Sequence, residues 1–209
     1  MWAALTAVVA ISLTPSAARA ADLDVMVRGP NGAPVADAVV TVETAEHKPL
    51  PARFVQPLAM SQRNQQFDPF VLVVPVGADV RFPNQDDVRH QVYSFSPTKT
   101  FELKLYGKDQ TRVVRFDKPG VVSLGCNIHD QMVAYIVVAD TAYAAKTDAG
   151  GHAVIHGLPA GAASVRVWHP YMKAPDNAQS FEASLPAAGS VSHTVTAALR
   201  TPPMRVNGY

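Results

Sequence analysis

Short runs of alternating apolar and polar residues, separated by turn residues, recur along most of the chain. Residues 22–28 (DLDVMVR) alternate as a half-buried strand does, and an apolar strand at 38–42 follows the turn signal at 29–32 (GPNG). Further strands are predicted at 70–74, 79–82, 92–95, 110–116, 121–125, 133–139, 152–156, 164–169 and 191–197. No segment has the pattern of a long helix. The sequence therefore predicts an all-β fold built of sandwiched antiparallel sheets.

The pattern of strands changes at two places along the chain. Residues 47–66 lose their period and gain proline, which indicates a boundary or linker, and the spacing of strands changes again after Asp140. At the N-terminus, the apolar run 2–13 is followed by a small-x-small site at residues 18–20, although nothing basic precedes Trp2. We interpret 1–20 as a signal peptide rather than a buried helix, and we expect export to the periplasm. The run is too short for a membrane span.

Composition excludes some classes of function. The chain has 209 residues and a formal net charge of +1, and its Lys and Arg are scattered rather than clustered, so we expect no nucleic-acid partner. We find no nucleophile triad, phosphate-binding loop or catalytic carboxylate pair, and we interpret Asp86-Asp87 as a charge pair in a loop. We therefore expect that the protein is not an enzyme.

The chain has a single cysteine, Cys126, and it stands in the segment 125–132 (GCNIHDQM). After export, a lone thiol has no partner for an intrachain disulfide, so it must be buried, paired between chains or bound to a metal. The segment also places His129 and Met132 at Cys-x2-His-x2-Met spacing, and His90 lies upstream as a second candidate histidine. Two imidazoles, one thiolate and a thioether are the ligands of a blue-copper electron-transfer site. Zinc stays an alternative, although structural zinc sites use Cys and His rather than thioether sulfur.

Other candidate residues are less specific. His152 and His156 share a face of one predicted strand without specifying a metal site, and His169 is interpreted as a packing residue at a strand end. The lysines of the central region form either a docking face for an acidic partner or an ordinary solvated surface; they are Lys99, Lys104 and Lys108.

The two motif regions resemble a known family. Residues 80–96 (VRFPNQDDVRHQVYSFS) and 125–132 are similar to cupredoxins with the short amicyanin-like loop, and to bacterial exported proteins labelled methylamine utilization proteins. The resemblance implies a Greek-key β-sandwich and one mononuclear copper ion, Cu(I)/Cu(II), held by His90, Cys126, His129 and Met132. It also implies an outer-shell position at Gln91, and we interpret Asn84 either as an outer-shell brace or as an ordinary turn residue. Many cupredoxins have Asn where this chain has Gln91. Amicyanin-like loops also have proline beside the second histidine, whereas Ile128 and Asp130 flank His129 here.

The segments on either side resemble the carboxypeptidase regulatory-like domain. The first is residues 29–40, and the second comprises 147–151 with 157–161. Since neither part has enough strands for a two-sheet core, we predict that 21–47 and 141–200 form one smaller Ig-like or transthyretin-like β-sandwich. A cupredoxin domain at 48–140 would be inserted between them, and 201–209 would be a C-terminal tail. The alternative is two unrelated segments packed on the copper domain.

These observations lead to three functional hypotheses. The first is a periplasmic copper protein that carries single electrons between redox partners, which by analogy are a c-type cytochrome or a quinoprotein amine dehydrogenase. The second is a protein for copper delivery or storage. The third is a non-redox binding module in which copper is structural.

Overall fold

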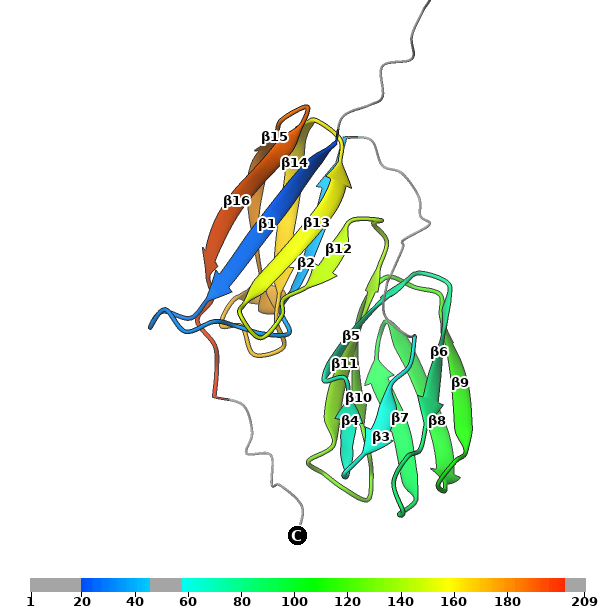
Figure 1. The fold of residues 1–209 in the computed structure, drawn as a ribbon. Helices are drawn as coiled ribbons and strands as arrows, with labels where there is room; N and C mark the ends of the chain where they lie inside the picture. The colour runs from blue at the N-terminus through cyan, green and yellow to red at the C-terminus, as the bar shows by residue number, and fades with distance from the viewer. Residues whose placement is uncertain (1–19, 46–57, 202–209) are drawn as a thin grey trace, which may run out of the picture.

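The computed structural model describes residues 20–45 and 58–201 (Figure 1). The predicted signal peptide, apart from Ala20, and the predicted tail, apart from Thr201, lie outside these residues, as does most of the predicted linker. Sixteen strands make up almost all the regular structure of the described part, with one short 3-10 helix, η1 (Pro175–Asn177). The prediction of an all-β sandwich fold without long helices is confirmed. Within the described part, no helix is long and apolar enough to cross a membrane.

Two facing sheets are formed by strands from both ends of the chain. A three-stranded sheet has the order β13-β1-β16, and a four-stranded sheet has the order β12-β2-β14-β15. Their bounds are β1 (Ala21–Arg28), β2 (Val39–Thr44), β12 (Ala144–Lys146), β13 (His152–Leu158), β14 (Gly161–Trp168), β15 (Ala178–Leu185) and β16 (Gly189–Thr196). Strand β1 alternates buried and half-buried residues, and its inward side chains Leu23, Val25 and Val27 meet Val40 and Val165 of the opposite sheet. The hydrophobic period therefore sets which face of β1 lies in the core.

The middle of the chain forms the other layers (Figure 1). A five-stranded sheet has the order β5-β11-β10-β7-β8, and it faces the pairs β3-β4 and β6-β9. The bounds are β3 (Ser61–Arg63), β4 (Gln66–Asp68), β5 (Val71–Pro75), β6 (Ala78–Pro83), β7 (His90–Ser96), β8 (Lys99–Tyr106), β9 (Thr111–Phe116), β10 (Gly120–Gly125) and β11 (Val133–Ala139). Their shared core includes Phe82, Phe116, Leu124 and Ile136, and it reaches Cys126 at one end. We refer to residues 58–140 as the middle module.

Strands β5 and β11 are buried on both faces. Their inner side chains, such as Leu72 and Ile136, enter the core of the middle module, whereas Val73 and Val137 on the outer side pack with Trp168 of β14. Continuous apolar runs are typical of strands buried on both faces, which explains why 70–74 does not alternate. Lys146 reinforces the contact because its ammonium donates to the carbonyl of Val71 at 3.0 Å.

Several strands were not expected from the sequence pattern. They are β3, β4, β8, β12 and β15. Strand β3 falls in the region interpreted as a linker, and it pairs with β4, at the end of that region, in a two-residue hairpin. Strands β8, β12 and β15 each lie at the edge of a sheet, where one side of the strand meets solvent. Edge strands carry more polar residues than central strands, so their hydrophobic signal is weak.

Candidate metal centre

A hairpin and a neighbouring strand bring the candidate ligands together. Residues 126–132 form the loop between β10 and β11, whose ends pair at Gly125 and Val133. His90 is the first residue of β7, and β7 pairs with β10 where Tyr93 meets Gly125. A Cβ at Gly125 would lie 2.6 Å from the Tyr93 ring, so glycine allows this close approach. The sheet register therefore places the start of β7 beside the loop.

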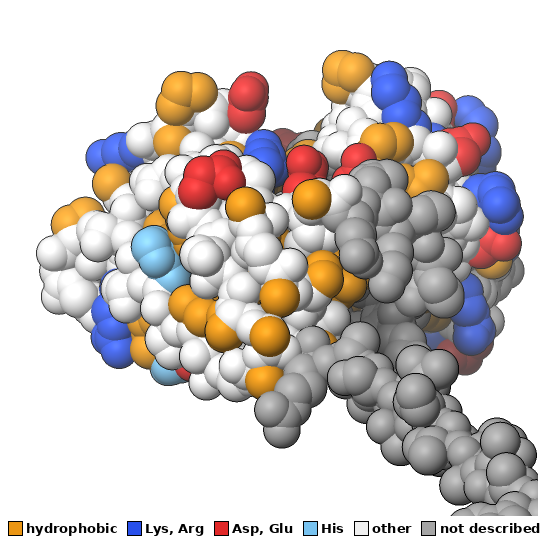
Figure 2. All heavy atoms as spheres, turned by 90° about the horizontal axis from the view of Figure 1, so that it is seen from above, with side chains coloured by type: hydrophobic (Ala, Val, Ile, Leu, Met, Phe, Trp, Pro, Cys, Tyr) orange, Lys and Arg blue, Asp and Glu red, His pale blue; other side chains and the backbone are white. Residues whose placement is uncertain are grey.

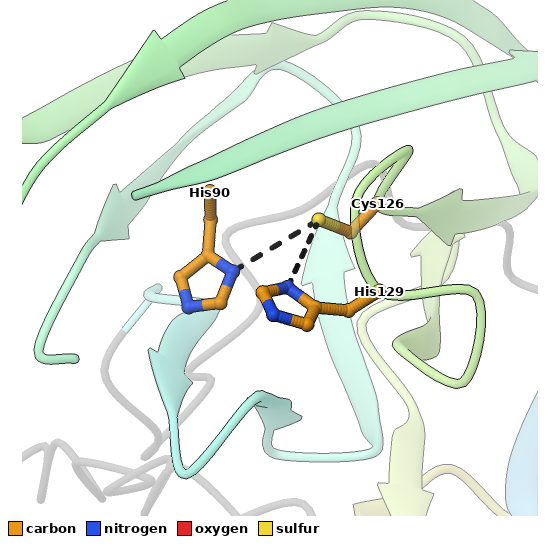
Figure 3. Close-up of side chains that lie close together, drawn as sticks. All are labelled: His90, Cys126 and His129. Atoms are coloured by element: carbon orange, nitrogen blue, oxygen red, sulfur yellow. Dashed lines mark hydrogen bonds between the residues drawn. The ribbon is translucent and has the colours of Figure 1, made fainter. Parts of the chain in front are cut away.

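Three of the predicted ligands converge (Figure 3). The Sγ atom of Cys126 lies 3.9 Å from Nδ1 of His90 and 4.0 Å from Nδ1 of His129. These three donor atoms all lie within 4.8 Å of one another, and no other such group of three occurs in residues 20–45 and 58–201. His90 and Cys126 are buried, whereas His129 is partly exposed. The site thus has two internal donors and one that reaches the surface.

The spacing of these donors fits a single metal ion. Sulfur and nitrogen ligands at about 2.3 Å and 2.0 Å from a shared ion stand roughly 3.5–4 Å apart, which matches the two separations between Sγ and Nδ1. A thiolate with two imidazoles suits copper that changes oxidation state, because thiolate favours Cu(I) and imidazole also suits Cu(II). The residues present therefore fit a copper ion.

Met132 is buried at the end of the loop that carries Cys126 and His129. It is 1% exposed, belongs to the same core cluster as Cys126, and lines a cavity of about 350 Å³ whose wall also includes Cys126. The Met132 amide donates to the carbonyl of His129 at 2.9 Å, which closes a turn within the loop. The turn returns the chain to β11 with the Met132 side chain inside.

The surroundings of Cys126 favour a thiolate. Burial alone would raise the pKa of the thiol, but hydrogen bonds from His90, from the amides of Gln91 and Ile128, and from His129 lower the pKa to about 6. For His90, burial lowers the imidazole pKa, while hydrogen bonds to Cys126 and Asp86 raise it, and the net direction is upward. A thiolate is the form that binds metals, so the site is prepared for ligation near neutral pH.

The two predicted outer-shell residues brace the loops around the site. The Gln91 side chain accepts a hydrogen bond from Nδ2 of Asn127 at 3.1 Å, which ties β7 to the Cys126 loop. Asn84 donates from Nδ2 to the carbonyls of Val88 and Tyr106, at 2.9 and 3.0 Å. Gln91 therefore joins the two segments that carry candidate ligands, whereas Asn84 shapes the β6–β7 loop.

Asp86 is a residue of the site that the sequence interpretation missed. It is 9% exposed, and its Oδ2 lies 2.6 Å from Nε2 of His90. Its neighbour Asp87 is instead exposed and pairs with Lys108 at 2.5 Å. Only Asp87 thus behaves as the expected loop charge. In the sequence, the only indication of this contact is that Asp86 stands four residues before His90. That spacing alone does not show whether Asp86 or Asp87 is the partner of His90.

Three other histidines of the described residues, His152, His156 and His169, lie apart from the centre. On the outer face of the β13-β1-β16 sheet, His152 lies 3.3 Å from Asp24, and His156 lies 2.9 Å from Asp22. His169 is buried at the end of β14, and burial lowers its pKa to about 4. These side chains form pairs or pack in a core.

The three lysines considered as a docking face each have an acidic neighbour. Lys99 pairs with Asp117, Lys104 with Glu102 and Lys108 with Asp87. In the view of Figure 2, acidic and basic side chains are likewise interspersed rather than gathered by sign. Charge near these lysines is locally balanced.

Comparison with known proteins gives structural neighbours only. No family model and no curated protein match this sequence. A purple cupredoxin from Nitrosopumilus maritimus is 22% identical over 39% of this chain and 98% of its own, with a TM-score of 0.36. A reduced Cu(I) form of a mutant amicyanin is 19% identical over 47% of this chain and 99% of its own, with a TM-score of 0.38. A copper-containing nitrite reductase from Thermus scotoductus SA-01 is 25% identical over 44% of this chain and 25% of its own, also at 0.38. Because these TM-scores are low, we argue the chemistry of the site only from the side chains of this chain.

Proposed function

We propose that the protein is a periplasmic type 1 copper protein that carries single electrons between redox partners. The observation that carries this proposal is the approach of His90 to Cys126, 36 residues apart in sequence, with Nδ1 at 3.9 Å from Sγ. His90, Cys126, His129 and Met132 would hold one mononuclear ion, with the thioether as a weak ligand. Export rests on the signal-like pattern of residues 1–20.

The residues of the chain would serve electron transfer by keeping the donor atoms in place. When bound, copper supplies a one-electron Cu(I)/Cu(II) couple. His90 is 0% exposed and opens a paired strand, and Cys126 follows another, so neither donor moves without disturbing the sheet. His129 is partly exposed beside Ile128, which is 50% exposed, so this edge is the proposed route for the electron. We propose no bond-making chemistry for the site.

The test is the colour of the protein with copper. Adding Cu(II) to the metal-free protein should give an intense visible absorption from a copper–thiolate bond, and Cys126→Ser should abolish it because the hydroxyl cannot replace the thiolate. His90→Ala should also lose the band, whereas the matched control His152→Ala should keep it, since His152 lies on another sheet. A colourless wild-type protein, or a blue Cys126→Ser variant, would contradict the proposal.

Electron exchange separates this function from its alternatives. A c-type cytochrome or a quinoprotein amine dehydrogenase is the class of partner that we propose by analogy. A blue protein that exchanges no electrons with a periplasmic cytochrome would instead favour copper delivery or storage, or a structural copper in a binding module. Each outcome can be read by mixing reduced protein with oxidised cytochrome and following both spectra.

A further inference from the structure

A buried carboxylate lies directly behind one of the candidate ligands. Asp86 stands in the loop between β6 and β7, and its Oδ2 lies 2.6 Å from Nε2 of His90, on the side of the imidazole ring away from Cys126. Both side chains are nearly free of solvent contact, at 11% for Asp86 and 0% for His90. An interaction shielded from water in this way is stronger than the same contact at the surface.

Asp86 is held by a separate element, the β3–β4 hairpin. The amide of Asn64 donates to Oδ1 at 2.5 Å, and the amide of Gln65 donates to Oδ2 at 2.9 Å. Both residues have left-handed backbone, with φ of 52° and 54°, as in a two-residue type I′ hairpin turn. The tip of the hairpin thereby directs two successive N–H groups at one carboxylate. Backbone donors of this kind stabilise a buried anion.

The loop itself adds a third restraint. The Asp86 amide donates to Oδ1 of Asn84 at 2.9 Å, and Asn84 is anchored in turn to the carbonyl of Tyr106. The position of the carboxylate is therefore set by the hairpin and by Asn84, which is itself fixed to the end of β8. Little freedom is left for Asp86 to turn away from His90.

This arrangement determines which nitrogen of His90 carries the proton. An ionised carboxylate only accepts hydrogen bonds, so Nε2 of His90 must be the donor. The other nitrogen, Nδ1, faces Sγ of Cys126, and it is the nitrogen that would give its lone pair to a metal ion. A ligand histidine that donates to a carboxylate is also more electron-rich, which strengthens its bond to a metal.

We propose that Asp86 is a positioning residue of the metal centre, which fixes the tautomer and orientation of His90 and strengthens the binding of Cu(II) more than that of Cu(I). This inference rests on the proposed function. The selectivity follows because the harder divalent ion gains more from an electron-rich nitrogen ligand, whereas the monovalent ion depends more on sulfur. The β3–β4 hairpin would then influence the reduction potential of copper through Asp86, without contacting the ion itself.

The test compares Asp86→Asn with Asp87→Asn in the full chain. Asp87 is the adjacent carboxylate, paired with Lys108 at the surface, so its variant removes the same charge without touching His90. For Asp86→Asn, we expect Cu(II) affinity to fall about 10–100-fold. With Cu(I) affinity retained, each tenfold loss raises the reduction potential by about 59 mV. Asp87→Asn should behave as wild type. Unchanged affinity and potential in Asp86→Asn, or equal shifts in both variants, would overturn the inference.

A second measurement requires neither copper nor a variant. Long-range ¹⁵N–¹H NMR of the metal-free wild-type protein should show a proton on Nε2 of His90, the nitrogen that faces Asp86. A His90 ring with its proton on Nδ1 alone would overturn the role of Asp86 even if Asp86→Asn fails to fold. A blue wild-type protein with the wrong tautomer would refute this inference alone, whereas a colourless wild-type protein would refute the proposed function and this inference with it.

Discussion

At the scale of single residues, the chemistry of the centre depends on what surrounds each donor atom. Cys126 could fill its site as a small buried hydrophobe. Instead, its sulfur meets two imidazole nitrogens, and donors from His90, the Gln91 and Ile128 amides and His129 lower its pKa to about 6. His169 shows the contrasting case of a histidine enclosed by packing. Burial lowers its pKa to about 4, with a smaller opposing effect from Asp37, and its Nδ1 accepts a hydrogen bond from the Tyr171 amide at 3.2 Å.

His169 therefore makes the stability of the protein depend on pH. Between pH 6.5 and about 4, the unfolded chain binds a proton at this residue and the folded protein does not, so stability is lost as the pH falls through that window. The loss has an upper limit of roughly 3 kcal/mol, since one pKa unit corresponds to about 1.4 kcal/mol. His169→Asn keeps an acceptor for the Tyr171 amide but does not titrate.

Denaturant unfolding at neutral pH and near pH 4.5 measures this effect. The wild-type protein should lose more free energy of unfolding between the two conditions than His169→Asn does. Equal losses in the two proteins, or an NMR titration of His169 near pH 6.5, would contradict the expectation.

At the scale of elements, close backbone contacts hold the turns that join the strands. Gly151, in the turn before β13, has a φ of 82°, and its carbonyl accepts from the Val27 amide at 2.8 Å. A Cβ at this position would lie 2.5 Å from the Val27 carbonyl oxygen and 3.1 Å from the Val35 amide nitrogen. Both contacts are with backbone, which cannot move aside as a flexible side chain can. The turn therefore requires glycine for its conformation and for the space it occupies.

Gly151→Ala should destabilise the protein by about 2–4 kcal/mol, because strained backbone and a steric clash add together. Gly157→Ala is the matched control. Gly157 also has a positive φ, of 76°, but nothing lies within 4 Å of its Cβ position, so only the backbone cost of about 1–2 kcal/mol applies. Chemical denaturation followed by circular dichroism gives both values. If both substitutions lowered the free energy of unfolding equally, the steric clash with the Val27 carbonyl would contribute nothing.

At the scale of the whole molecule, the β13-β1-β16 and β12-β2-β14-β15 sheets, together called the outer sandwich, combine two interior strands from the N-terminal part of the chain with five strands from the C-terminal part. Strand β1 lies between β13 and β16, and β2 lies between β12 and β14. We propose on this basis that 21–47 and 141–200 unfold as one unit, with 48–140 as a separate one. The two parts also touch, since Tyr135 packs edge-on against Trp168 with ring centroids 5.8 Å apart.

Leu23→Ala tests the proposed unit. Leu23 is 0% exposed in the core of the outer sandwich, so its truncation should cost about 2–5 kcal/mol. Hydrogen exchange should then show lost protection in β13, β14 and β16, which lie far along the chain, as well as in β1 itself. Leu72→Ala, in the core of the middle module, is the control and should affect β10 and β11 first. Unchanged protection of β14 in Leu23→Ala would rule out a single split unit.

Much of this protein could be predicted from local sequence, because strands and turns depend on nearest neighbours. The two-residue period of residues 22–28 and the turn residues around it predict a half-buried strand, and β1 has that burial pattern. The Cys-x2-His-x2-Met spacing likewise names three of the candidate donors, because they share one short loop. Polar edge strands such as β15 were missed, since their hydrophobic period is weak.

Other features depended on which segments meet in space. Sequence alone did not separate Asp86 from Asp87, because both are adjacent carboxylates in the same loop; the turn of the β6–β7 loop and the β3–β4 hairpin bury one behind His90 and leave the other paired with Lys108. The double burial of β5 and β11 likewise comes from the outer sandwich packing on their second face. Local pattern thus determined most of the strands and most donor types, whereas the tertiary structure decided the neighbours of each donor. The reason is that hydrogen bonding and burial depend on distance in space rather than along the chain.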